Sequence, residues 1–133
     1  MDLMSGALVS GRKLRVLTVV DGCTRDPLAV WCNFSIPGER VVAVLEQIIL
    51  VRGKPQQTRA NNGPLFRDMT FRSWCQKEGV TMKYTQPKKP MRNAYIERLT
   101  RTFREDVLDA YLFESPEEVR ILSNEWQDSY MIH

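Results

Sequence analysis

The stretch LRVLTVVDGCTRDPLAVWCNF, residues 14–34, decides the fold class of this chain. Its first seven residues are rich in β-branched side chains and end at Asp21-Gly22, which predicts a strand that runs into a turn. Residues 28–34 predict the antiparallel partner of that strand. Residues 3–9 predict an earlier strand, so the chain is expected to begin with an antiparallel meander.

Helices and strands alternate after this meander. A helix is predicted to begin at Pro37, as its first helical residue, and to end at Gly53. Its apolar face is formed by Val41, Val42, Val44, Leu45, Ile48 and Ile49. An extended stretch at residues 56–60 precedes a second helix over residues 66–78, which Gly79 ends. Residues 80–84 predict another short strand.

Two more helices complete the predicted order. A long helix is expected from about residue 93 to about residue 113, because apolar residues recur there at helical spacing. They are Ile96, Leu99, Phe103 and Val107. Ser115-Pro116-Glu117-Glu118 is a capping box that predicts the start of the last helix, which carries Val119, Leu122 and Trp126 inward. This order favours an α/β fold, a mixed sheet with helices packed on it.

Composition limits the kind of protein. The 133 residues suit one domain, and 43% hydrophobic with 26% charged residues is typical of a globule with one core. No apolar run is long enough to span a membrane, and no signal peptide is visible. Cys23, Cys32 and Cys75 lack metal-site spacing, and His133 is the single histidine. We expect free thiols in a reducing cytoplasm.

Charge is distributed unevenly along the chain. Seven basic residues and one acid occupy residues 83–104, whereas eight acids and one base follow them. A cationic segment of this kind is suited to a polyanion such as nucleic acid, although a charge run is also typical of an ordinary solvated face.

Five motifs, in order, resemble one known family. RVLTVVDGCTR, SIPGERVVAVLEQIILVRGKP, RANNGPLF and QPKKPMRNAYIERLTRTFREDVL follow a short MDL at the start, and 35 residues separate Asn61 from Glu97. Together they resemble the integrase-like catalytic core of bacterial insertion-sequence transposases, a DDE superfamily. The resemblance covers nearly the whole chain. It implies a ribonuclease-H-like fold with a mixed five-stranded sheet and helices on both faces, in a bacterial cytoplasmic protein.

The resemblance also implies a site. By position, the catalytic triad is Asp2, Asn61 and Glu97, with Asp2 and Glu97 as ligands of Mg²⁺ or Mn²⁺. Such cores hydrolyse a phosphodiester at a transposon end and join the freed 3′ end to target DNA. Hard carboxylate oxygens suit magnesium, and two ions can stabilise both oxygens of an in-line displacement. The chain is expected to be one domain, residues 1–133, truncated at both ends.

Asn61 departs from the family, which has an aspartate there. An amide contributes no net charge, so turnover is expected to fall by orders of magnitude. The nearest downstream acid, Asp68, is predicted inside the second helix and is not expected to substitute. Each residue also has an ordinary interpretation: Asp2 as a frayed terminal residue, Asn61 as a turn residue, and Glu97 as an ion-pair partner of Arg101.

Basic residues are expected to border this site. The long helix supplies a stripe and the preceding loop a cluster, suited to phosphate contacts with weak sequence specificity. They are Arg98, Arg101 and Arg104 on the helix and Lys88, Lys89 and Arg92 in the loop. The predicted partners are DNA and further copies of the chain, with no membrane. Three rival functions stay open: an active nuclease with a substitute ligand, a non-enzymatic DNA-binding or interaction module from a decayed transposase, and a fragment without a present role.

Overall fold

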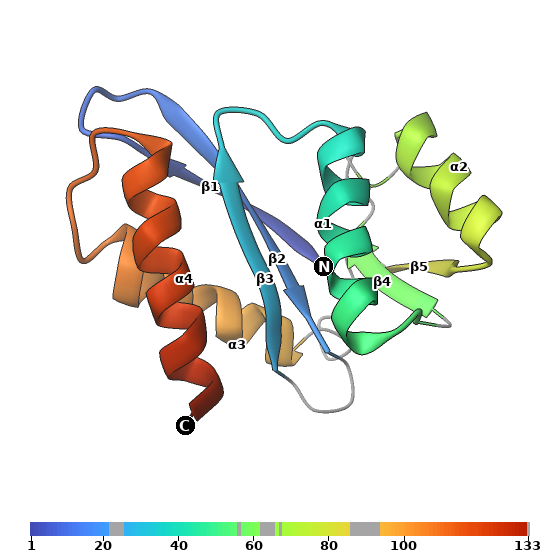
Figure 1. Ribbon diagram of the computed structural model, residues 1–133. Coiled ribbons are helices and arrows are strands. Elements are labelled where there is room, and N and C mark those ends of the chain that lie inside the picture. The colour runs from blue at the N-terminus through green and yellow to red at the C-terminus, as the bar shows by residue number, and fades with distance from the viewer. Residues whose placement is uncertain (22–25, 56, 62–65, 67, 86–93, 133) are drawn as a thin grey trace.

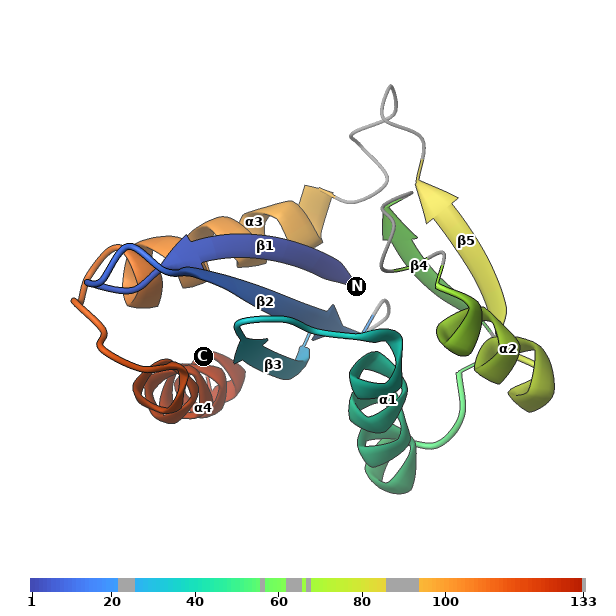
Figure 2. The ribbon, with the colours of Figure 1, turned by 90° about the horizontal axis from the view of Figure 1, so that it is seen from above.

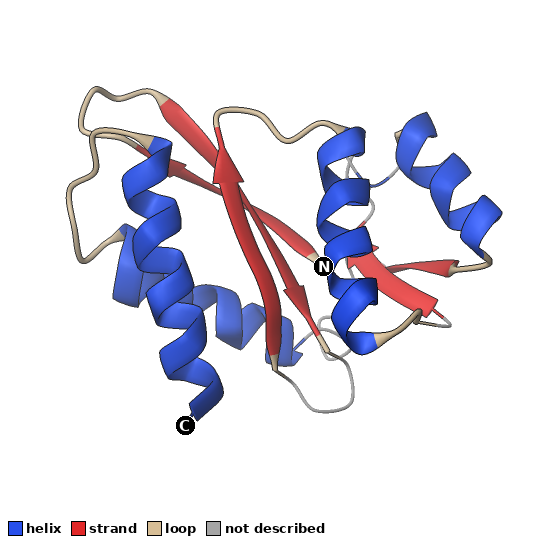
Figure 3. Cartoon of the chain, in the orientation of Figure 1, coloured by secondary structure: helices blue, strands red, loops and turns tan. Residues whose placement is uncertain are grey.

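The computed structural model describes residues 1–21, 26–55, 57–61, 66, 68–85 and 94–132 (Figure 1). Within them the order is three strands, then helices and strands in alternation (Figure 3). The elements are β1 (Asp2–Ala7), β2 (Lys13–Val20), β3 (Pro27–Asn33), α1 (Gly38–Arg52), β4 (Gln57–Asn61), α2 (Met69–Glu78), β5 (Thr81–Thr85), α3 (Ala94–Phe103), the π-helical turn η3 (Arg104–Leu108) and α4 (Pro116–Ile132). The predicted α/β class and element order are therefore confirmed.

The described strands form an antiparallel set and a parallel set. β1, β2 and β3 pair antiparallel in sequence order, whereas β4 and β5 pair parallel. The amino group of Met1 donates to the carbonyl of Arg59 in β4 at 2.7 Å and connects the two sets. Figure 2 shows the start of β1 beside β4 at this junction. The described strands therefore form a three-stranded and a two-stranded sheet, where the resemblance implies a single five-stranded sheet.

Helices cover both faces of the strands, as predicted. The side chains of β2 alternate between two buried clusters, since successive residues of a strand point to opposite faces. Leu17 and Val19 pack with α1 and α2, whereas Leu14 and Val16 pack with α3, η3 and α4. β2 is therefore the strand on which both halves of the core are built.

The ends of α1 and α2 differ slightly from the predicted ends. Pro37 is the N-cap of α1 and not its first helical residue, because its backbone is extended. The start of α2 at residue 66 is wrong: the helix begins at Met69. Asp68 is its N-cap, and its carboxylate accepts hydrogen bonds from the N–H groups of Thr70 and Phe71. A side-chain oxygen that satisfies free N–H groups is a strong start signal; Phe66 lies outside the helix and packs edge-on against Phe71.

The long helix is shorter than predicted. It runs regularly from Ala94 to Phe103, continues as the π-helical turn η3 and ends at Leu108. The segment that follows carries Phe113 into the core, where its carbonyl accepts from the N–H of Val9. The predicted buried stripe is nevertheless confirmed through both parts, since its four members are at most 5% exposed.

α4 covers the open edge of the sheet. Arg120 donates to the carbonyl of Cys32 and Gln127 to the carbonyl of Pro27, both in β3. An uncovered edge strand invites pairing with another chain, and a helix laid along it prevents this. The capping box is confirmed in part, because the hydroxyl of Ser115 accepts from Glu118 N, while Glu118 accepts from Glu114 N.

No described helix combines the length and the apolar character that a membrane crossing requires.

Candidate active site

Asp2 is fixed at the start of β1 by contacts on three sides. One carboxylate oxygen accepts from the backbone N–H of Leu3 at 2.9 Å, and the other accepts from the hydroxyl of Thr100 on α3 at 3.3 Å. Its own carbonyl accepts from the buried Thr18, its register partner in β2. Asp2 is half-buried and anchored, so its interpretation as a frayed terminal residue is wrong.

Glu97 lies one turn before Thr100 on α3. Residues three apart on a helix are neighbours on its surface, so the hydrogen bond from Thr100 to Asp2 places the helix face of Glu97 next to Asp2. Glu97 is exposed and forms no salt bridge with any residue that the structure describes. The ordinary interpretation of Glu97 as an ion-pair partner of Arg101 is therefore wrong, and the carboxylate is accessible.

Asn61 is the last residue of β4, where its backbone pairs with Thr85 of β5. It belongs to a strand end and not to a free turn; its side chain lies outside the described part. The hydrogen bond from Met1 to Arg59, two residues earlier, brings this end of β4 to the start of β1. The elements that carry Asp2, Asn61 and Glu97 therefore meet at one end of the strands.

No group of three acidic, Cys or His side chains that could hold a metal exists among the described residues. The described hard-oxygen donors here are the carboxylates of Asp2 and Glu97, which suit a hard cation.

The arginines of the predicted basic stripe differ in exposure and in their contacts. Arg98 and Arg101 are exposed and have no ion-pair partner within the described segments. Arg104 is half-buried, and its guanidinium donates to the carbonyl of Ser5 in β1 at 2.6 Å. Arg104 therefore ties η3 to β1. Lys88, Lys89 and Arg92 lie outside the described residues.

The carboxylate of Asp68 is engaged at the start of α2 and does not lie inside the helix as predicted. One of its oxygens already accepts two N–H groups of α2. The carboxylate also lies against Gly38, where a β-carbon would collide with it. Asp68 joins the starts of two helices.

Sequence comparison decides the family. The integrase core domain family matches residues 1–90, and a second integrase core domain family matches residues 78–131. The chain belongs to the integrase core domain family.

Insertion-element proteins are similar to this integrase core over nearly its whole length. A 39.2 kDa protein of insertion element IS476 from Xanthomonas euvesicatoria is 35% identical over 130 residues, 98% of this chain. A 31.7 kDa protein of IS407 from Burkholderia multivorans is 33% identical over 129 residues. The chain spans 38% and 47% of these two proteins.

Solved structures confirm the ribonuclease-H-like fold of this integrase core. The catalytic core domain of HTLV-2 integrase, solved in complex with magnesium, has a TM-score of 0.62 and 19% identity, with 83% of this chain and 68% of that chain covered. The catalytic core domain of BIV integrase has a TM-score of 0.64 and 20% identity, with 91% and 77% covered.

Sequence reasoning missed the two threonines that hold Asp2. Thr18 is a polar residue within the apolar run of residues 16–20, and Thr100 follows Glu97 by three residues. Both features are weak evidence, because nothing in the sequence around Thr18 or Thr100 predicts a contact with Asp2.

Proposed function

We propose that this integrase core is the catalytic part of an insertion-sequence transposase, in which Asp2, Asn61 and Glu97 are the active-site positions. The hydrogen bond between Thr100 and Asp2 carries the proposal. It connects strand β1 to the helix of Glu97, so residues 98 apart in sequence meet. The relation to insertion-element proteins supports DNA as the substrate, and their greater length supports this chain being one part of a longer protein.

The donor set fits a divalent cation. Asp2 and Glu97 offer carboxylate oxygens, and Asn61 offers an amide oxygen, all hard donors of the kind that magnesium and manganese prefer. When bound, such ions supply activation of the attacking oxygen and stabilisation of the leaving oxygen in phosphodiester displacement. In this proposal the hydroxyl of Thr100 orients Asp2 by fixing one of its carboxylate oxygens. The accessible carboxylate of Glu97 is the ligand supplied by α3.

Phosphate contacts are assigned to α3. Arg98 and Arg101 are exposed on the helix that carries Glu97, so they lie close to the scissile phosphodiester in this proposal. Contacts of this kind position a nucleic acid without reading its sequence. We propose the same role for Lys88, Lys89 and Arg92, which precede the helix. Arg104 contributes by fixing η3 to β1.

Asn61 makes the site one negative charge short. A neutral amide cannot offset repulsion between two divalent ions as a carboxylate does, so the unmodified chain is proposed to be impaired by orders of magnitude. Assembly into dimers or higher complexes on DNA is a further part of the proposal.

The test is a DNA nicking assay with magnesium or manganese. We expect weak or undetectable cleavage by the unmodified chain, a large gain with Asn61→Asp, and loss of that gain when Glu97→Gln is added. Robust cleavage by the unmodified chain would refute the impairment. Salt-dependent DNA binding that survives Glu97→Gln, with no cleavage by Asn61→Asp, would favour the second candidate, a DNA-binding module derived from a transposase; the exposed Arg98 and Arg101 support this candidate.

A further inference from the structure

Two hydrogen bonds join one face of α3 and η3 to β1. Thr100 donates to the carboxylate of Asp2 at the start of the strand, and Arg104 donates to the carbonyl of Ser5 further along it at 2.6 Å. Figure 2 shows α3 running along β1. Apolar packing is not directional, so these two directional contacts fix the rotation of the helix and its position along the strand.

Glu97 belongs to the same face of the helix. At about 100° per residue, Arg104 lies within about 20° of Glu97 around the helix axis, and Thr100 lies within about 60°. Arg98, by contrast, lies about 100° from Glu97 around the axis. Glu97 is therefore the exposed end of a row whose other two members, Thr100 and Arg104, are attached to β1.

The π-helical turn η3 lies directly on β1. The N–H of Asp109 donates to the carbonyl of Arg104 at 2.8 Å and closes this turn. Leu108 packs over Gly6, where an added β-carbon would lie 3.4 Å from Leu108 Cδ1. Single π-helical turns are rare and are frequent at functional sites. A small residue of β1 therefore allows η3 to approach closely, and Arg104 satisfies the carbonyl of the neighbouring Ser5.

Arg104 differs from the other two arginines of the stripe in what its guanidinium can do. It is half-buried, whereas Arg98 and Arg101 are exposed. A planar guanidinium loses little freedom for each hydrogen bond that it forms, so it is well suited to hold a backbone carbonyl in one direction. The exposed arginines, by contrast, are free to contact phosphates.

We propose that Arg104 is a positioning residue of the active site. By holding η3 against β1 it keeps Glu97 beside Asp2, and it makes no phosphate contact. The inference rests on the proposed function, because it assumes that Asp2 and Glu97 bind a common cation. It divides the predicted stripe into two roles: Arg98 and Arg101 contact phosphates, and Arg104 aligns the metal ligands.

The first test is Mn²⁺ titration in the Asn61→Asp background. Arg104→Met cannot donate to Ser5, and we expect it to weaken Mn²⁺ binding roughly tenfold, as the loss of a residue that orients a metal ligand does. The direction is decisive, because removal of a nearby positive charge would by itself strengthen cation binding. Arg104→Lys keeps a charged donor and should retain most of the affinity. Unchanged or tighter binding by Arg104→Met overturns the inference.

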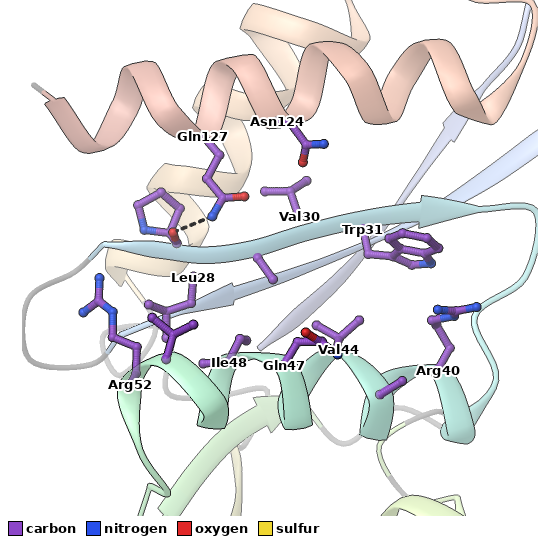
Figure 4. Close-up of a pocket in the computed structure, with 14 residues that line it drawn as sticks. Leu28, Val30, Trp31, Arg40, Val44, Gln47, Ile48, Arg52, Asn124 and Gln127 are labelled. Carbon is purple, nitrogen blue, oxygen red and sulfur yellow. Dashed lines mark hydrogen bonds between the residues drawn. The ribbon is translucent and has the colours of Figure 1, made fainter.

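Arg40→Met is the matched control for this titration. Arg40 lies at one end of a groove of about 610 Å³ between β3, α1 and α4 (Figure 4), on the α1 face of the sheet. Its guanidinium carbon lies 4.7 Å from the ring centroid of Trp31. The change removes the same charge and a guanidinium contact, but away from α3, so Mn²⁺ affinity should stay unchanged. A loss equal to that of Arg104→Met would overturn the inference.

The salt dependence of duplex binding tests the phosphate role. Arg104→Met should leave the slope of log K against log salt unchanged, whereas Arg98→Met should reduce it by about 0.9. If Arg104→Met reduces the slope and leaves Mn²⁺ affinity intact, Arg104 is a phosphate contact. The inference is then wrong, and the proposed function stands.

Amide hydrogen exchange tests the contact without metal or DNA. Loss of one hydrogen bond should speed the exchange of the α3 amides roughly fivefold in Arg104→Met, with no change in Arg40→Met. If Asn61→Asp binds no Mn²⁺, the proposed function fails, and this faster exchange still supports the role of Arg104 in holding α3. Unchanged exchange in Arg104→Met overturns that role.

Discussion

Replacing Thr100 by valine tests how Asp2 is positioned. Valine has nearly the same shape as threonine but cannot donate a hydrogen bond, so the change removes the contact from Thr100 Oγ1 to Asp2 Oδ2 with little repacking. Asp2 keeps the hydrogen bond from Leu3 N. The carboxylate then has one fixed oxygen and one free oxygen, and its orientation towards α3 is lost.

The structure sets the expected size of the effect. A hydrogen bond to an ionised group contributes about 1.5–3 kcal/mol. The contact here is 3.3 Å long and only half-buried, so we expect a loss of about 1 kcal/mol in the free energy of unfolding. Partners that orient a metal ligand typically change affinity by about 10–100-fold. For a single long hydrogen bond we expect Mn²⁺ to bind roughly tenfold more weakly, at the lower end of that range.

The assay is Mn²⁺ titration followed by electron paramagnetic resonance, in the Asn61→Asp background where the site has its full charge. Thr100→Ser keeps the hydroxyl and should restore most of the affinity. Thr102→Val is the matched control, because Thr102 is half-buried on the same helix and its hydroxyl makes no hydrogen bond with a described residue. If Thr100→Val binds Mn²⁺ as tightly as its parent while Asn61→Asp does bind the ion, Thr100 does not position Asp2 and the reasoning is refuted.

Two further predictions concern stability. Asp68→Ala removes the cap of α2 and should lower the free energy of unfolding by about 1–2 kcal/mol in urea denaturation, whereas Asp68→Asn, which keeps an acceptor, should lose much less; equal losses would contradict the capping role. Burial raises the pKa of the Cys32 thiol from 9.0 to about 11. The unfolded chain therefore releases this proton at lower pH than the folded chain, and stability should fall as pH rises from about 9 to about 11, by up to about 1.4 kcal/mol per pH unit. Cys32→Ala should show a shallower fall over that window, and an identical pH dependence would contradict the prediction.

Much of the fold is encoded locally. The β-branched residues in the stretch 14–20 and the helical spacing of Ile96, Leu99 and Phe103 each depend on neighbours within a few residues. Such local patterns predict an element without knowledge of its partner, and the helical spacing also predicts the buried face. The boundaries were less predictable: residues 66–68 resemble the start of a helix, but Asp68 is the cap because its carboxylate accepts N–H groups that the helix leaves free.

Some features of the site follow from the sequence, and others only from the tertiary structure. The sequence by itself determined which element ends carry Asp2, Asn61 and Glu97, and that the middle position lacks a carboxylate. The tertiary structure alone decided that Thr100 holds Asp2 and that Arg104 binds the carbonyl of Ser5. These contacts join residues that are distant in sequence. Strand register and helix packing bring the partners together, so the sequence around each residue does not indicate which partner it will contact.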